Sequence, residues 1–69
     1  MKISARNILK GTVTSITKGA TTSHVKIDIG GSSVVTASIT NAAVDELKLA
    51  VGKPAYAVIK ASDVMVGID

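Results

Sequence analysis

Two short stretches of the sequence pair a cationic side chain with a serine two residues away. Ser4 and Arg6 have this spacing near the start, and Lys60 and Ser62 repeat it near the end. Because side chains alternate between the two faces of a β-strand, each cation and its serine would project from one face. Guanidinium, ammonium and hydroxyl groups all donate hydrogen bonds, as an oxyanion requires. The spacing favours two halves of a site for one small anion.

Both stretches lie in segments that are otherwise apolar and that we expect to be strands. A cation in a buried strand costs desolvation free energy unless it has a partner. None of the five acidic residues lies within two positions of Arg6 or Lys60, and the nearest to Lys60 is Asp63, three positions away. A bound anion would supply the missing partner. The alternative is that both side chains reach solvent from the strand ends.

A third group of donors is expected at the start of a short helix over residues 40–47. Thr40 is a suitable N-cap, and the first turn after it carries no acid, so an anion could approach the free N–H groups there. The Thr40 hydroxyl can accept from a helix N–H and still donate its own proton to a ligand. A threonine-capped short helix is also common, so a purely structural role stays open.

Length and composition limit how the fold can be stabilised. A chain of 69 residues buries only a small core. It has no cysteine and one histidine, which excludes disulfides, thiolate metal sites and multi-histidine metal sites. Hydrophobic residues make up 46% of the chain, a large share for so small an interior. Oligomerisation is the remaining means of stabilisation, and we expect it.

Charge and motifs exclude several classes of function. The net charge is +3, but the lysines are scattered, and Tyr56 is the single aromatic residue. Single-stranded nucleic acids are bound largely by stacking on aromatic side chains, so nucleic acid is a poor candidate partner. There is no Ser-His-Asp context and no phosphate-binding glycine loop, so we expect no enzyme activity. No apolar run approaches the roughly 18 residues of a membrane helix, and no signal peptide is recognisable. We expect a cytoplasmic protein without a membrane partner.

The hydrophobic pattern predicts an all-β fold with one short helix. Residues 24–30 alternate cleanly between apolar and polar side chains, and Gly30 and Gly31 indicate a hairpin. Gly11 indicates a bend in a long first strand. Three strands before one short helix and two after it are typical of a small OB-like five-stranded β-barrel. We expect residues 1–69 to form this barrel as a single domain. The expected strands cover residues 2–16, 24–30, 33–40, 55–62 and 64–68.

Four stretches of the sequence resemble one known family. ISARN at the start, SIT before the helix, ELKLAVGK in the middle and VIKASDVMV near the end are similar to the molbindin or Mop proteins, historically called molybdenum-pterin-binding proteins. The same module is known as the TOBE or Mop domain. The resemblance covers nearly the whole chain, in the order that the family has.

The resemblance implies an OB-like barrel in a hexamer, arranged as a trimer of dimers, that binds molybdate or tungstate at subunit interfaces. It implies a role in intracellular molybdenum storage and homeostasis, with an OB-type nucleic-acid-binding module as the alternative. Ser4 and Arg6 would contact the oxyanion from one subunit. Thr40, the helix amides around Ala43 and Lys60 would contact it from a second subunit. Ala61 and Ser62 would add backbone or hydroxyl donors.

Overall fold

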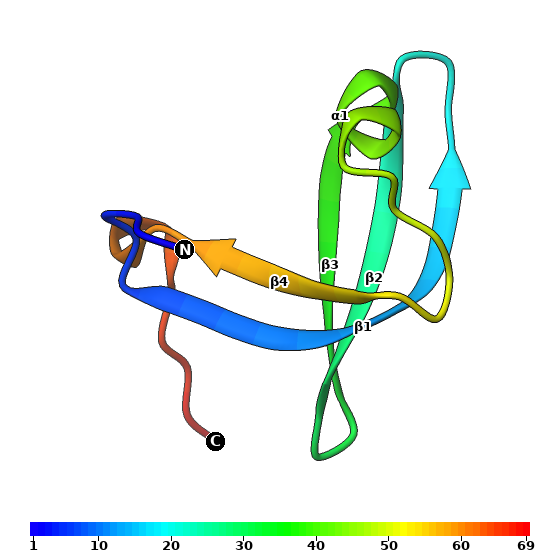
Figure 1. The fold of residues 1–69 in the computed structure, drawn as a ribbon. Helices are drawn as coiled ribbons and strands as arrows, with labels where there is room; N and C mark the ends of the chain where they lie inside the picture. Colours follow the sequence, from blue (N-terminus) through cyan, green and yellow to red (C-terminus); the bar gives the residue numbers. More distant parts are fainter.

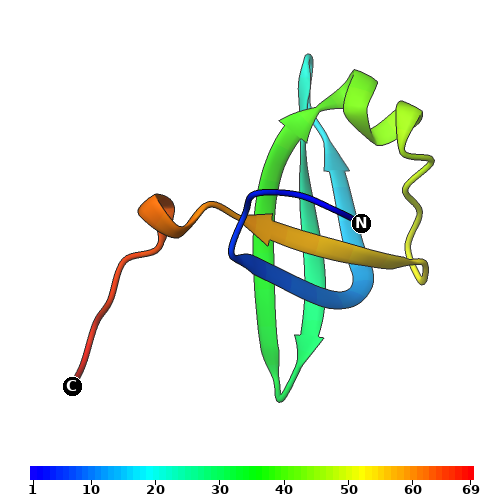
Figure 2. The same ribbon diagram turned by 60° about the vertical axis from the view of Figure 1, so that its left-hand side comes forward.

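A computed structural model describes all residues 1–69 and shows a curled antiparallel sheet with one short helix (Figure 1). The four strands lie in the order β3-β2-β1-β4, so β3 and β4 form the two edges. Figures 1 and 2 show that the curl makes a half-barrel, with the helix at one end. The elements are β1 (Asn7–Lys18), β2 (Thr22–Gly30), β3 (Ser33–Thr40), α1 (Asn41–Glu46), β4 (Pro54–Ile59) and a 3-10 turn, Ala61–Asp63.

The concave face of the sheet carries a small hydrophobic core. The predicted alternation in β2 is confirmed: Val25 and Ile27 are buried, whereas His24, Lys26 and Asp28 are exposed. The next strand begins after a turn at Gly30 and Gly31, whose positive φ angles of 93° and 58° suit glycine. The buried hydrophobic residues of the whole chain are Val13, Val25, Ile27, Val44 and Ala57.

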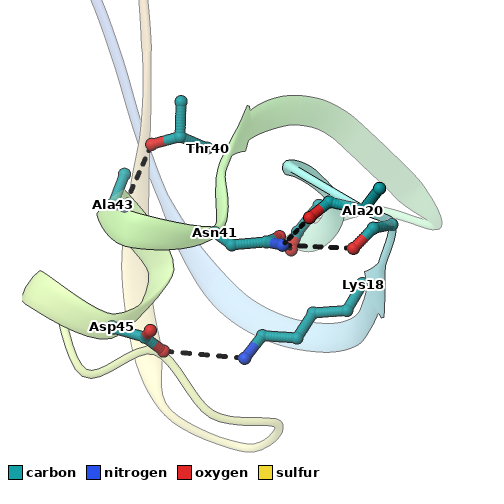
Figure 3. Close-up of polar contacts among 8 residues, drawn as sticks. Lys18, Ala20, Thr40, Asn41, Ala43 and Asp45 are labelled. Atoms are coloured by element: carbon teal, nitrogen blue, oxygen red, sulfur yellow. Dashed lines mark hydrogen bonds and ion pairs between the residues drawn. The ribbon is translucent and has the colours of Figure 1, made fainter.

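The helix begins where the sequence predicts. Thr40 is its N-cap, and the Ala43 N–H donates to the Thr40 hydroxyl oxygen at 3.0 Å (Figure 3). Asn41 fixes the helix to the turn between β1 and β2, because its side-chain amide donates to the carbonyl of Gly19 at 3.1 Å. The buried Ser23 hydroxyl donates to the Asn41 side-chain oxygen. The short helix is therefore held by side chains as well as by its own backbone.

The first strand pairs with two different neighbours along its length. Residues from Asn7 to Thr12 pair with β4, and residues from Thr12 to Lys18 pair with β2. Gly11 lies at the change of partner, and a Cβ atom there would lie only 2.2 Å from the carbonyl oxygen of Asp28. The glycine predicted to allow a bend allows β1 to approach β2 this closely. The pairing register also shifts between Val13 and Ser15.

Three expectations about the strand ends are wrong. The first strand begins at Asn7 rather than at residue 2, and β4 ends at Ile59 rather than at residue 62. Residues 64–68 form no strand, so the half-barrel has four strands instead of five. In each case the residue pattern suits a strand, but no neighbouring backbone in the chain pairs with it. None of the helices is long and apolar enough to cross a membrane.

We expect Gly11→Ala to destabilise the fold strongly. The added methyl group meets the Asp28 carbonyl and the Ile27 side chain, and such overpacking costs about 2 kcal/mol or more in free energy of unfolding. Urea denaturation at a fixed protein concentration measures the change. Gly67→Ala is the matched control, because an added Cβ atom there would meet no residue other than its chain neighbours within 4 Å. Equal midpoints for the two variants would contradict the close approach of the strands.

Candidate functional site

Pairing of β1 with β4 brings residues 3–6, which precede β1, next to residues 60–62, which follow β4. Asn7 lies opposite Ile59, and the Asn7 side-chain amide donates to the Ile59 carbonyl at 3.3 Å. The residues just before β1 and just after β4 therefore lie beside each other, as Figure 1 shows. A hollow forms between them. It is lined by Ile3, Ser4, Ala5, Arg6, Lys60, Ala61 and Ser62.

This hollow contains both Ser-x-Arg and Lys-x-Ser stretches. Five of the seven predicted site residues line it, including both cations and both serines. Ile3 and Ala5 also line it, and as apolar residues they gave no sign of this in the sequence. Asn7 was missed as well, although its place directly after Arg6 and its amide side chain were a usable signal. It joins the two walls through its bond to Ile59.

The cations are exposed within one chain, which corrects the expectation that they lie inside buried strands. Arg6 precedes β1 and Lys60 follows β4, so neither is enclosed by the sheet. Their side chains form no ion pair or hydrogen bond, and the ion pair of the chain joins Lys18 to Asp45 at 3.7 Å (Figure 3). No acidic residue lines the hollow. The result is a concentration of positive charge without a compensating carboxylate.

The wall that follows β4 is shaped by the 3-10 turn. Lys60 has extended backbone, and its carbonyl accepts from the Asp63 N–H at 2.9 Å, which closes the turn. Ala61 and Ser62 then face residues 3–6 across the hollow. The hollow measures about 490 Å³ and is open to solvent, so it is much larger than one small tetrahedral ion. One chain can surround such an ion on one side only.

Thr40 and Ala43 are not part of this hollow. They lie at the start of α1, near the opposite end of the half-barrel from the 3-10 turn (Figure 1). The Ala43 N–H is already bonded to the Thr40 hydroxyl oxygen, which leaves the hydroxyl proton free to donate. The resemblance grouped Lys60 with Thr40, but within one chain Lys60 lies with Arg6 instead.

Comparisons with known proteins agree on one family. The model of the TOBE domain matches residues 3–66. A protein of Haemophilus influenzae named "Probable molybdenum-pterin-binding protein" is 58% identical over 69 residues, which is the full length of both chains.

Solved structures of the same group share the fold. A molybdate-binding protein from Sporomusa ovata is 37% identical, with a TM-score of 0.92, over 99% of this chain and 100% of that one. The cytoplasmic molybdate-binding protein ModG, solved with molybdate bound, is 45% identical, with a TM-score of 0.94. The match covers all of this chain and 49% of ModG. The chain belongs to the TOBE domain family and, within it, to the Mop or molybdenum-pterin-binding proteins.

Proposed function

We propose that this protein binds molybdate and that the hollow between residues 3–6 and residues 60–62 is part of the site. The observation that carries the proposal is the meeting of Arg6 and Lys60, with a serine beside each, in a hollow without acids. The names of the relatives support it, because they describe molybdenum-pterin-binding and molybdate-binding proteins. They favour an oxyanion over a nucleic acid as the ligand, and binding over catalysis.

The chemistry of the hollow suits a fully deprotonated tetrahedral dianion. One guanidinium and one ammonium balance its two negative charges, and the Ser4 and Ser62 hydroxyls can donate further hydrogen bonds. Hydrogen phosphate brings a proton that needs an acceptor, and no carboxylate lines the hollow to provide one. Sulfate has the same charge as molybdate but is smaller, so the size of the completed site must exclude it. Tungstate matches molybdate in charge and nearly in size, and we propose it as a second ligand.

A second chain would complete the site. The hollow is open on one side, and Thr40 and the amides around Ala43 cannot reach it within the same chain. We place them, as the family resemblance suggests, on a neighbouring subunit, where the free Thr40 proton would point to the oxyanion. Six copies arranged as a trimer of dimers would provide such interfaces. Each copy would contribute residues 1–69 as one Mop domain.

The biological role that follows is storage and homeostasis of molybdate inside the cell. Reversible binding at several equivalent interfaces would hold the ion without transforming it. The description of ModG as a cytoplasmic protein supports the same compartment for this one.

We expect molybdate and tungstate to raise the melting temperature, because a ligand that binds only the native state stabilises it by mass action. Sulfate and phosphate at equal concentration should have much smaller effects. Differential scanning fluorimetry and isothermal titration calorimetry measure both. Equal stabilisation by all four ions would indicate a general anion patch and would contradict a specific molybdate site.

Arg6→Ala and Lys60→Ala should each weaken molybdate binding about tenfold or more, since a charge-assisted hydrogen bond contributes roughly 1.5–3 kcal/mol. Arg6→Lys should also weaken it, because an ammonium cannot reproduce the planar donor fork of arginine. Calorimetric titration gives the dissociation constants. Lys26→Ala is the matched control: it removes the same charge from the exposed face of β2 and should bind like the unmodified protein. Unchanged affinity in both Arg6→Ala and Lys60→Ala would place the site elsewhere.

Light scattering at micromolar concentration should give a particle of about six times the 7.0 kDa mass of one chain. Thirteen large hydrophobic residues are exposed on a single chain, which is more than an isolated small domain normally carries. A stable monomer under these conditions would contradict both the assembly and the proposed interface site.

A further inference from the structure

The start of α1 is tied to the turn between β1 and β2 by one residue, Asn41. Its backbone N–H donates to the Thr21 carbonyl at 2.9 Å. Its side-chain amide donates to the carbonyls of Gly19 at 3.1 Å and Ala20 at 3.4 Å (Figure 3). The first helical residue is therefore held to the turn by both its backbone and its side chain.

The same side chain is the partner of a buried hydroxyl. Ser23 in β2 is the buried polar residue of the chain, with 0% exposure, and its hydroxyl donates to the Asn41 side-chain oxygen. A buried hydroxyl without a partner costs free energy, so this bond is needed. It also fixes the orientation of the amide, because a flipped amide would turn its oxygen toward two carbonyls of the turn. Asn41 thus has one favourable orientation.

A second contact ties α1 to the same turn, but it is weaker. Lys18 and Asp45 form an ion pair at 3.7 Å, and their side chains are 58% and 70% exposed. Exposed ion pairs contribute little to stability, because water and salt screen them. The bond between Asn41 and Ser23 is shielded from water by the burial of Ser23. Asn41 is therefore the residue that sets where α1 begins.

Thr40 is the donor whose position depends on Asn41, which directly follows it. Thr40 ends β3, where it pairs with Thr22 of β2. Its hydroxyl accepts from the Ala43 N–H, so the direction of the remaining proton follows that of the first helical turn. A donor supplied to a binding site by a separate element must be held within about 0.5 Å of its required place. The bonds of Asn41 provide this precision.

We propose that Asn41 is a positioning residue of the oxyanion site. It does not touch the ion. With Ser23 it holds the start of α1 so that the Thr40 hydroxyl points toward the hollow of a neighbouring subunit. The inference rests on the proposed function, in which Thr40 completes that hollow. A side chain remote from the hollow thereby sets part of the affinity through the residue beside it.

Calorimetric titration with sodium molybdate tests this role in a double-mutant cycle. Asn41→Ala removes the side-chain bonds, and we expect molybdate to bind about threefold to tenfold more weakly. Thr40→Val keeps the shape of the side chain but removes the hydroxyl, and it should also weaken binding. The double variant should bind no more weakly than Thr40→Val alone, because Asn41 acts through that hydroxyl. Additive losses, or no loss in one of the single variants, would overturn the proposal.

The titration is made at a temperature where each variant is folded and assembled, as circular dichroism and light scattering show. A loss of stability alone then leaves the affinity unchanged. If Asn41→Ala does not assemble, Ser23→Ala takes its place in the cycle. It removes one bond to the same amide, keeps the two bonds to the turn, and should weaken binding about twofold to threefold. Unchanged affinity in Ser23→Ala would then refute the positioning role.

Matched variants show which contact acts and which proposal is at fault. Lys18→Ala breaks the ion pair, and Lys26→Ala removes the same charge from the exposed face of β2. Both should bind molybdate equally, and weaker binding in Lys18→Ala would assign the positioning role to the ion pair instead. Weaker binding in Arg6→Ala together with unchanged binding in Asn41→Ala refutes the positioning role alone. No molybdate binding by the unmodified protein refutes the proposed function as well.

Discussion

The whole arrangement depends on the close approach of β1 to β2 at Gly11. With no Cβ atom in the way of the Asp28 carbonyl, β1 can bend and exchange one neighbour for the other at Thr12. Its second half extends the sheet formed with β2 and β3, while its first half carries β4. This bend curls the sheet, places β3 and β4 at facing edges, and brings the ends of β1 and β4 together. The hollow results from it.

Local signals predicted local structure well. The alternation in β2, the glycine hairpin and the Thr40 cap each depend on neighbouring residues, and the structure confirms all three. The limits of β1 and β4 could not be predicted in this way, because the strand pattern continues beyond the last paired residue. The expected fifth strand shows the same effect, since residues 64–68 have a strand-like pattern but no partner in their own chain.

The candidate site could be predicted in part. Residue type and spacing identified Ser4, Arg6, Lys60 and Ser62. The meeting of the two stretches depends on the pairing of β1 with β4, which no local pattern encodes. The expectation that the cations are buried was wrong, because both flank their strands. Burial of Arg6 and Lys60 would arise only if another subunit covers the hollow. The sequence predicted that Thr40 caps the helix and offers donors there. It did not predict that these donors lie away from the hollow.

The long-range pairing of β1 with β4 also has a consequence for the order of folding. The meander of β1, β2 and β3 is joined by short turns, so it closes only small loops. Asn7 and Ile59 are 52 positions apart, and their contact must close a loop that includes most of the chain. We therefore expect the β1–β4 pairs nearest Asn7 and Ile59 to form late in folding and to open first. The hollow lies directly beside them, so its donors come together only after the rest of the sheet has folded.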